Sequence, residues 1–330
     1  MNRLTVSKLI ALSVGLICIY SAYHYNKSAT YQISGPIYGT YWQLVSTEYI
    51  PDSLKQSIEV ELARIDLIAS NYKESSELSR INAAPIDVEI IISPEMYSIL
   101  SYAEKLYQLT AGLYDVTVGS LVIDKGFGPE DPMNQNTIPV SVKRFDLISN
   151  NSIIKNDNFQ FDLSSIAKGY AVQLIHEYLL QNNLPNHLID IGGELIINGS
   201  NNNLPWKVEI QNPAALSDNA IYIIENKNDF LSIATSGEYR NYKINSNNEK
   251  ISHTLNPKTL SSIKSKALSV TVAHKTSATY ADALATAFNV IGYPESLDYA
   301  NKNNIALMLV VELDNEFKLM FSNEWYNLGL

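Results

Sequence analysis

Two oxygen-bearing side chains near the C-terminus, Asp282 and Thr286, have a spacing that suits a metal-ion site. They lie in an alanine-rich segment, 275–288, between a β-branched run at 268–272 and Gly292, so we predict a strand followed by a helix. Residues four apart share one face of a helix. A carboxylate and a hydroxyl among small side chains favour a hard cation such as Mg²⁺, which also binds substrate phosphates. In the structural alternative, Asp282 only offsets the helix dipole and Thr286 bonds to the helix backbone.

A second segment, residues 162–169, predicts an anion site at the start of a helix. It reads Asp-Leu-Ser-Ser-Ile-Ala-Lys-Gly, and apolar residues then recur at helical spacing. We expect Asp162 to cap this helix, whose free N–H groups would attract an anion, and Lys168 in the first turn adds positive charge. In the structural alternative, Asp162 is only a cap and Lys168 is only solvated.

His253 is the candidate general base, because an imidazole changes its protonation state near neutral pH. It follows residues 234–240, which we interpret as a strand end running into a tight turn, and it precedes Asn256 and Pro257. A histidine that is only hydrogen-bonded at a strand end is the alternative. The other histidines lack a comparable context and are expected to be structural: His24, His176, His187 and His274.

Three short motifs also match those of serine β-lactamases and penicillin-binding proteins. Ser165 and Lys168 form an S-x-x-K pair, residues 217–219 read Ser-Asp-Asn, and residues 275–277 read Lys-Thr-Ser, which is close to K-T-G. In those enzymes the third motif lies on a strand beside the nucleophile, whereas here Lys275 begins the turn into the predicted helix. A serine hydrolase acting through Ser165 and Lys168 is therefore kept as an alternative function, less favoured than the metal site at Asp282 and Thr286.

The first 30 residues differ in composition from the rest of the chain. Arg3 and Lys8 precede fifteen uncharged residues, 9–23, and the first acidic residue is Glu48. This pattern is typical of a signal peptide or a short membrane anchor, and it predicts that the rest lies outside the cytoplasm. We favour an uncleaved anchor in the cell inner membrane, with the domain at the periplasmic face. Cleavage of the segment, or lipidation at Cys18, are the alternatives.

Residues 31–330 form the predicted catalytic domain, which is long enough to bury a large core. They carry a net charge of −13, which argues against nucleic acid as a partner and means that an anionic substrate needs a cation nearby. Cys18 is the only cysteine of the chain, so the domain has no disulfide and is held together by its core.

Hydrophobic periodicity predicts helices over 54–71, over 94–111 and from 162 onward. It predicts strands over 31–45, 187–197 and 268–272, further strands within 205–275, and a C-terminal hairpin over 305–311 and 317–321. The strand over 187–197 is interrupted at Gly192-Gly193, where we expect backbone or a ligand to approach closely. Residues 73–82 read as a polar loop, and 130–160 as a loop with one short strand. Because helices and strands do not alternate regularly, we predict an α+β fold with mixed and antiparallel sheets and packed helices.

The order of the motifs resembles the ApbE family of FAD:protein FMN transferases over residues 38–292. The resemblance is carried by residues 162–172, Gly192-Gly193, 234–239, 253–257 and 281–287, with further matches at 39–41, 71–72, 79–82 and 114–119. It implies the T-fold-like architecture of these flavin transferases. It also implies an exported, Mg²⁺-dependent enzyme that transfers the FMN moiety of FAD to a Thr or Ser hydroxyl of an acceptor flavoprotein and releases AMP.

The resemblance also implies roles for individual residues. His253 would be catalytic. The metal would be held by the backbone carbonyls of Ser165 and Ala285 and by the side chains of Asp282 and Thr286. Contacts to FAD would come from Tyr38, Tyr72, Leu113, Tyr114, Asp115, Asp162, Lys168 and Leu255. Flavoprotein subunits of membrane electron-transport complexes are the expected acceptors. A FAD pyrophosphatase at the same site, with water as the acceptor, and a flavin-binding protein without turnover are the alternatives.

Several positions depart from the family pattern. Tyr38 stands where Met is frequent, Asn256 replaces an Asp before Pro257, and Leu260 replaces a Gly. Asp190 and Glu194 flank the double glycine where Asn and Asp are common. These departures bear on how His253 is activated more than on FAD binding.

Overall fold

The computed structural model describes residues 12–20, 29–129, 144–213, 219–237, 242–244, 250–263, 265–314 and 316–330. Residues 12–20 are helical and their side chains are exposed. Within these ranges, no helix combines the length and apolar character that crossing a membrane requires. Parts of three predictions lie outside the described residues: Arg3 and Lys8, residues 217–218 of the Ser-Asp-Asn motif, and residues 238–240.

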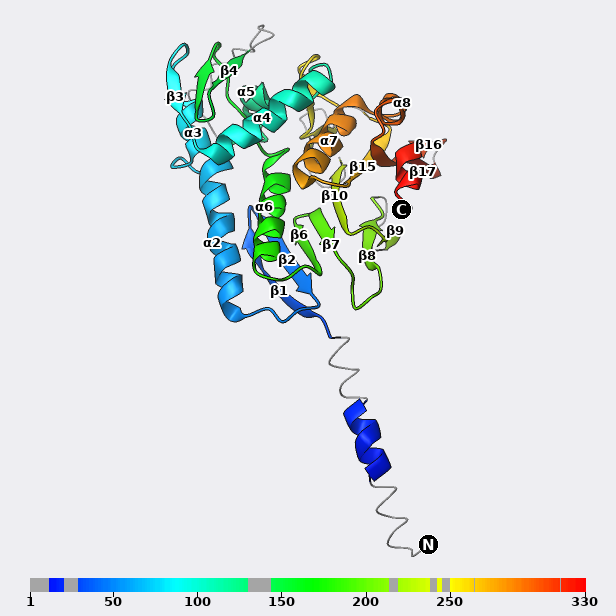
Figure 1. Ribbon diagram of the computed structural model, residues 1–330. Coiled ribbons are helices and arrows are strands. Elements are labelled where there is room, and N and C mark those ends of the chain that lie inside the picture. The colour runs from blue at the N-terminus through cyan, green and yellow to red at the C-terminus, as the bar shows by residue number, and fades with distance from the viewer. Residues whose placement is uncertain are drawn as a thin grey trace, which may run out of the picture.

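An eight-stranded antiparallel sheet organises the domain (Figure 1), with the strand order β1-β2-β6-β7-β10-β15-β16-β17. Every neighbouring pair in it is antiparallel. The strands are β1 Tyr31–Ile37, β2 Thr40–Ser46, β6 His187–Ile191, β7 Glu194–Asn198, β10 Phe230–Gly237, β15 Ala267–His274, β16 Ala306–Leu313 and β17 Glu316–Phe321. The sheet and its helices confirm the predicted α+β class.

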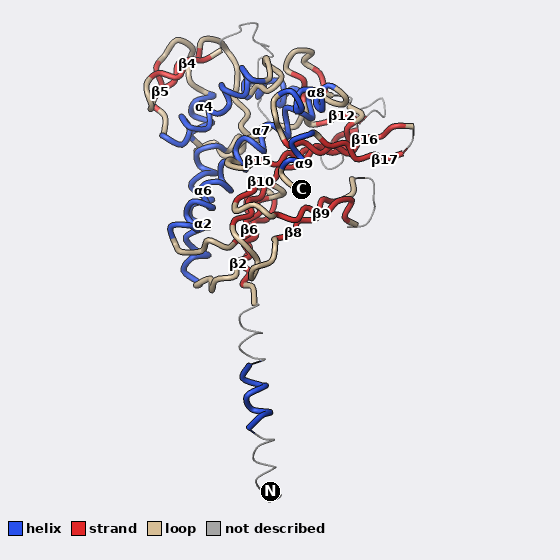
Figure 2. The backbone as a smooth tube through the Cα atoms, turned by 45° about the vertical axis from the view of Figure 1, so that its right-hand side comes forward, coloured by secondary structure: helices blue, strands red, loops and turns tan. Residues whose placement is uncertain are grey.

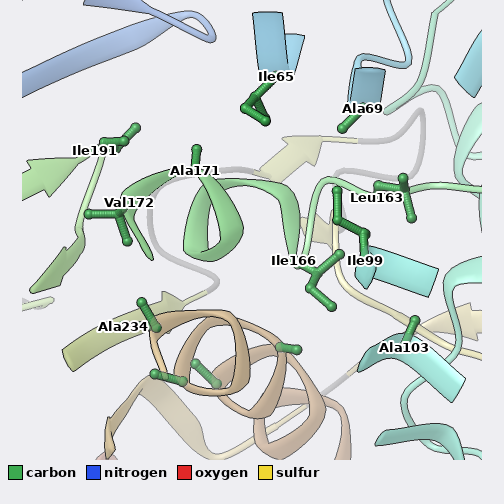
Figure 3. Close-up of a cluster of buried hydrophobic side chains, with 14 of the residues drawn as sticks. Ile65, Ala69, Ile99, Ala103, Leu163, Ile166, Ala171, Val172, Ile191 and Ala234 are labelled. Carbon is green, nitrogen blue, oxygen red and sulfur yellow. The ribbon is translucent and has the colours of Figure 1, made fainter. Parts of the chain in front are cut away.

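Four amphipathic helices form the layer on one face of this sheet: α2 Asp52–Ala69, α4 Pro94–Leu109, α6 Ala167–Gln181 and α7 Ala278–Ile291. Helices α6 and α7 pack directly on the strands, α2 contacts β1 and α6, and α4 contacts α2 and α7. Figure 2 shows these helices gathered on one side of the strands. In the core between them, Ala171 of α6 points toward Ile65 of α2 (Figure 3). Helices α2 and α4 bury the apolar stripe that the sequence predicts. Helix α6 instead buries Ala171, Val172, Ile175 and Leu179, and α7 is buried on nearly every face.

A second, smaller core covers the opposite face of the sheet. It is formed by the hairpin of β8 (Trp206–Gln211) and β9 (Ala220–Asn226) and by the short helix α9 (Asn323–Asn327). In β16, Leu307 and Leu309 belong to the first core and Met308 to the second. Because β16 is covered on both faces, residues 306–311 read as a continuous apolar run rather than an alternating one.

Smaller elements complete the domain. A three-stranded sheet has the order β3-β5-β4, with β3 Glu89–Ile91, β4 Phe145–Ile148 and β5 Ser152–Lys155. Two hairpins stand outside the main sheet: β11 Tyr242–Ile244 with β12 Lys250–Ser252, and β13 Leu255–Asn256 with β14 Ser261–Ser262. The short helices are α3 Glu77–Asn82, the 3₁₀ helix η1 Val116–Val118, α5 Gly119–Asp124 and α8 Glu295–Lys302.

Two predicted single strands are in fact hairpins. Residues 31–45 contain β1 and β2, joined at Tyr38 and Gly39, whose φ angles are 49° and 72°. Residues 187–197 contain β6 and β7, joined at Gly192 and Gly193, whose φ angles are 63° and 100°. Two consecutive residues with positive φ form the tight turns that connect antiparallel strands. Hydrophobic alternation continues across such a turn and does not reveal it.

Two predicted loops also contain regular structure. The segment 73–82 includes α3, whose first turn is capped by Ser76 Oγ accepting a hydrogen bond from Ser79 N at 3.0 Å. The described part of 130–160 contains two strands, β4 and β5, rather than one. Both segments contribute a few buried side chains to the main core, among them Leu78, Ile81 and Ile153, and these are too few and too closely spaced to show a period in the sequence.

Helix α6 begins later than predicted. Its first residue is Ala167, and Asp162 caps the preceding turn instead, since its Oδ1 accepts a hydrogen bond from Ser164 N at 2.8 Å. The first turn of α6 crosses α7 at Gly169, where a Cβ would lie 2.5 Å from the Ala278 carbonyl oxygen and 2.6 Å from Asp282 Cβ. The Gly169 N–H donates to Asp282 Oδ2 at 2.8 Å. The close crossing therefore holds the Asp282 carboxylate against the N-terminus of α6.

We expect Gly169→Ala to destabilise the domain although alanine is the better helix former. Relief of the clash with α7 should cost about 1–3 kcal/mol, more than the roughly 1 kcal/mol that alanine gains over glycine in a helix. Urea unfolding measures the change in the free energy of unfolding. A variant as stable as the wild type would show that α6 and α7 separate without cost and that the crossing does not constrain Asp282.

Two neutral histidines, His176 on α6 and His187 on β6, form a buried pair. His187 Nδ1 lies 2.6 Å from the Leu184 carbonyl oxygen, so Nδ1 carries the proton and Nε2 is an acceptor. His176 Nδ1 therefore donates to His187 Nε2, at 2.9 Å. Burial lowers the pKa of each ring to about 4. The pair thus stabilises the fold in its uncharged form, as expected for structural histidines.

This pair predicts a loss of stability in mild acid. Between pH 6.5 and about 4 the unfolded chain binds protons that the native pair excludes, so the contribution of this pair to the free energy of unfolding falls as pH falls through this window. The slope should approach about 1.4 kcal/mol per pH unit for each histidine. Denaturant unfolding at pH 7, 6 and 5 measures it. His176→Asn keeps an N–H donor near the Nδ1 position and should reduce the slope, and an unchanged slope would contradict the assignment.

Candidate functional site

Two adjoining cavities lie between the helices and the main sheet. They are bordered by α2, by the first turn of α6, by α7 and by the ends of strands β7 and β10. The first, of about 590 Å³, contains Tyr38 and Tyr72 among mainly apolar walls, and we call it the tyrosine cavity. The second, of about 300 Å³, is lined by the carboxylates of Asp115, Asp162, Glu194 and Asp282, and we call it the acidic cavity. Ser164 and Lys168 line both cavities and mark their junction.

The fold brings nearly all of the predicted site residues to these two cavities. Tyr38 and Tyr72 line the tyrosine cavity, and Lys168 lines both. The acidic cavity contains the others: Leu113, Tyr114, Asp115, Asp162, Ser165, His253, Leu255, Asp282 and Thr286. Ala285 is fully buried in α7 and is absent from the lining of either cavity. These residues come from segments as far apart as 38 and 286, and the tertiary fold assembles them.

Asp282 and Thr286 present their oxygens to the acidic cavity from one face of α7, as predicted. Thr286 Oγ1 lies 3.3 Å from Ser236 Oγ on β10. Asp282 is buried, only 3% exposed, and burial raises its pKa, so a cation beside it would relieve an unfavourable negative charge. Among the described residues, no group of three or more His, Cys, Asp or Glu side chains forms a metal cage. The oxygen donors fit Mg²⁺, which takes few protein ligands and keeps water or phosphate oxygens.

Lys168 provides positive charge at the junction of the two cavities. Its Nζ forms an ion pair with Glu194, whose side chain is buried, while the Lys168 side chain is 30% exposed. Burial alone would lower the pKa of Lys168, but the carboxylates of Glu194 and Asp282 outweigh it and raise this pKa, so the ammonium stays charged. Burial raises the pKa of Glu194, against the opposing effect of Lys168. Lys168 therefore lines both cavities with its ammonium paired to a buried carboxylate, and part of its side chain remains exposed to solvent.

The remaining polar residues of the acidic cavity are held by hydrogen bonds. Tyr114 Oη lies 3.1 Å from Ser165 Oγ, and burial raises the pKa of this phenol. Asp162 Oδ1 accepts a second hydrogen bond from Asn71 Nδ2 at 2.8 Å. These contacts hold the side chains that line the cavity in place before a ligand binds. Less side-chain entropy is therefore lost on binding.

The carboxylate of Asp115 has structural partners on both of its oxygens. Its carboxylate caps η1 by accepting hydrogen bonds from the backbone N–H and the hydroxyl of Thr117 at 2.8 and 2.7 Å. Its other oxygen faces the Arg144 guanidinium at 3.4 Å. Asp115 therefore shapes the cavity wall that Leu113 and Tyr114 form.

His253 lies in the short connection between β12 and β13 and forms the outer wall of the acidic cavity. Its ring packs against Phe127, with the ring centroids 6.3 Å apart. Asn256, the departure from the family pattern, uses its side chain elsewhere: its Oδ1 accepts hydrogen bonds from the backbone N–H groups of Lys258 and Thr259 at 2.9 and 3.2 Å. Asn256 therefore stabilises the β13–β14 turn.

The two tyrosines of the tyrosine cavity differ in exposure to solvent. Tyr38 is anchored, since its hydroxyl donates to the Leu62 carbonyl oxygen at 2.8 Å. Tyr72 is 70% exposed and its hydroxyl donates to the Phe127 carbonyl oxygen at 2.9 Å, across the mouth of the site. Phe127 thus connects Tyr72 of one cavity to His253 of the other.

The structure does not support the serine hydrolase alternative, because its third motif, residues 275–277, lies away from the site. Lys275 lines a different cavity, beside Glu324 at 3.8 Å, and does not approach Ser165 or Lys168. Lys168 is itself held by Glu194 rather than by Ser165. The structure therefore separates the residues whose order in the sequence suggested a hydrolase.

Two site residues were not predicted from the sequence: Glu194, which holds Lys168, and Asn71, which holds Asp162. A signal for Glu194 was present, because it follows the Gly192-Gly193 turn and a charged residue there is unusual in a buried strand. Asn71 belongs to the family match at 71–72, but asparagine after a helix is common and the match by itself assigns it no contact.

Comparisons with known proteins identify the family of this chain. The profile of the ApbE family matches residues 38–309. The FAD:protein FMN transferase of Haemophilus influenzae is 34% identical over 288 residues, which cover 83% of this chain and 82% of that protein. The FAD:protein FMN transferase of Vibrio cholerae is 33% identical over 301 residues, with 87% and 89% covered.

Solved structures show the same fold. The flavin transferase ApbE from Vibrio cholerae superposes with a TM-score of 0.78 at 29% identity, covering 91% of this chain and 99% of that one. The apo flavinyl transferase ApbE from Pseudomonas stutzeri gives a TM-score of 0.79 at 26% identity, with 91% and 96% covered. With a profile match over most of its length and relatives that align nearly end to end, the chain belongs to the ApbE family.

Proposed function

We propose that this chain transfers the FMN moiety of FAD to a Thr or Ser hydroxyl of an acceptor flavoprotein, with release of AMP. The observation that carries the proposal is the pair of cavities joined at Lys168. The tyrosine cavity has the size and apolar walls for a flat ring system, and the acidic cavity has groups suited to a diphosphate and its cation. The family relationship and the names of the relatives support flavin transfer.

In the proposed reaction, the acceptor hydroxyl oxygen attacks the phosphorus of the FMN half of FAD. A new P–O bond forms, the bond to the bridging oxygen breaks, and AMP leaves. His253 accepts the proton of the hydroxyl. Lys168 places positive charge at the junction, and Glu194 keeps its ammonium in position. When bound at Asp282 and Thr286, Mg²⁺ would neutralise the charge of the diphosphate.

We also propose that the enzyme acts outside the cytoplasm, held at the inner membrane by residues 1–30, on flavoprotein subunits of membrane electron-transport complexes. The support is the basic and then apolar N-terminal sequence and the family resemblance. The absence of cysteine after Cys18 suits a domain that folds without disulfides in an oxidising compartment.

The transfer itself predicts a covalent product. The protein, FAD, Mg²⁺ and a candidate acceptor domain should give an acceptor whose mass increases by one FMN phosphoester, together with an equal amount of AMP. His253→Ala should slow transfer by about 10²–10⁴-fold while FAD still binds, because only the proton acceptor is lost. AMP and free FMN without labelled acceptor would identify a pyrophosphatase instead.

The metal assignment predicts a specific loss in Asp282→Asn. The amide keeps an oxygen for the Gly169 N–H and removes the charge, so the fold should remain while Mg²⁺-dependent turnover falls by about 100-fold. Mg²⁺ titrations of FAD binding and of turnover measure the effect. Thr286→Val removes the hydroxyl oxygen and should weaken the dependence of turnover on Mg²⁺. Thr286→Ser keeps the hydroxyl and should retain that dependence. Equal Mg²⁺ dependence in wild type and Asp282→Asn would contradict the assignment.

A further inference from the structure

A buried asparagine on α7 contacts the segment that carries His253. Asn289 is fully buried, and its Nδ2 donates a hydrogen bond to Thr254 Oγ1 at 3.1 Å. Thr254 directly follows His253 in the chain and is itself buried. The hydrogen bond therefore joins α7 to the connection between β12 and β13, which carries the proposed proton acceptor.

Both neighbours of His253 in the chain are held by hydrogen bonds. Ser252 is buried, and its Oγ accepts from the Thr254 N–H at 3.1 Å. The Ser252 carbonyl oxygen accepts from Ser262 Oγ at 2.8 Å, and the Thr254 carbonyl oxygen accepts from the Ile263 N–H at 3.2 Å. The last two bonds hold the connection to the end of the β13–β14 hairpin, and the bond from Asn289 holds it to α7.

Asn289 shares a helical face with the proposed metal ligands. It comes three residues after Thr286 and seven after Asp282, so the three side chains lie on one side of α7. Asp282, Thr286 and Thr254 line the acidic cavity, whereas Asn289 does not. One helix thus carries both the ligands proposed for Mg²⁺ and the hydrogen bond to the neighbour of His253.

The stability of α7 does not account for an asparagine at this position. Its neighbours in the chain, Phe288 and Val290, are buried and apolar. Within the described part of the chain, Asn289 Oδ1 has no hydrogen-bond partner. A buried amide with one of its two groups unpaired stabilises a fold less than an apolar side chain of similar size does. A role in the site accounts for this residue better than a role in the core.

We propose that Asn289 is a positioning residue, which through Thr254 fixes the position of His253 relative to Asp282 and Thr286 on α7. This proposal rests on the proposed function, in which His253 accepts the proton of the acceptor hydroxyl. Because that hydroxyl attacks the diphosphate that lies beside Asp282 and Thr286, the proton acceptor must keep a fixed geometry to α7. Without the hydrogen bond from Asn289, the connection between β12 and β13 is free to shift on α7, and His253 shifts with it.

The test removes the hydrogen bond from each side in the full chain. Asn289→Ala removes the amide, and Thr254→Val removes the hydroxyl while nearly keeping the shape of the side chain. Thr254→Ser keeps the hydroxyl and is the conservative variant. Ser296→Ala on α8 is the matched control, because Ser296 is fully buried, does not line the acidic cavity, and has an Oγ without a hydrogen-bond partner among the described residues. Urea unfolding of each variant checks that the domain remains folded.

The kinetic measurement is AMP release by the full chain with FAD, Mg²⁺ and an acceptor. We expect Asn289→Ala and Thr254→Val each to lower kcat about tenfold, with the KM for FAD and the Mg²⁺ dependence unchanged. Thr254→Ser and Ser296→Ala should keep the wild-type kcat. In a His253→Ala background, Asn289→Ala should cause no further loss, because its effect passes through the histidine.

Three kinetic results would overturn the proposal. The first is an equal loss of kcat on Asn289→Ala with and without His253, which would mean that Asn289 acts on another part of the site. The second is a loss of FAD or Mg²⁺ affinity with kcat unchanged, which would assign Asn289 to the metal site. The third is a wild-type kcat in both Asn289→Ala and Thr254→Val.

A second measurement does not depend on turnover. In the NMR spectrum of the chain with isotope-labelled histidine, the His253 signal is identified by its loss in His253→Ala. Asn289→Ala should shift or broaden this signal and leave those of His176 and His187 in place, and Ser296→Ala should change none of them. An unchanged His253 signal in Asn289→Ala would reject the positioning role. A changed signal in a chain that releases no AMP would retain that role and reject the transferase proposal instead.

Discussion

The close crossing of α6 and α7 is the constraint on which the site depends. Gly169 lets the backbone of α6 approach α7 until its N–H binds the Asp282 carboxylate. The bond places a buried negative charge at a helix N-terminus, where the helix dipole favours it. The same crossing sets Lys168, the next residue back, at the junction of the two cavities. One glycine thus determines the relative positions of the proposed metal ligand and the cation.

The acidic cavity gathers several carboxylates, and the described cations neutralise only some of them. Four carboxylates line the acidic cavity, while Lys168 is paired with Glu194 and Asp115 faces Arg144. Burial raises the pKa of Asp282, against the opposing effects of the Lys168 charge and of the hydrogen bond from the Gly169 N–H. A divalent cation that arrives with a diphosphate would satisfy this carboxylate and the phosphates together.

Hydrophobic patterning predicted the helices well and the turns poorly. Helix α7 follows its prediction because Ser277 caps it, alanines favour it and Gly292 ends it, all of which are local signals. The β1–β2 and β6–β7 hairpins were predicted as single strands because their turns depend on positive φ at Tyr38, Gly39, Gly192 and Gly193, not on polarity. Asp162 was expected to start α6, yet it caps a separate turn because Asn71 and Ser164 bind its Oδ1.

The sequence by itself determined the amphipathic helices, the buried strands, the order of motifs and the pairing of Asp282 with Thr286 on one helical face. These follow from interactions between residues close in the chain. Only the tertiary structure decided that Glu194 holds Lys168, that Lys275 stays away from Ser165, and that two cavities meet at one ammonium. Such contacts join residues 26 or more positions apart, and they arise when the sheet and helices pack, so no local pattern encodes them.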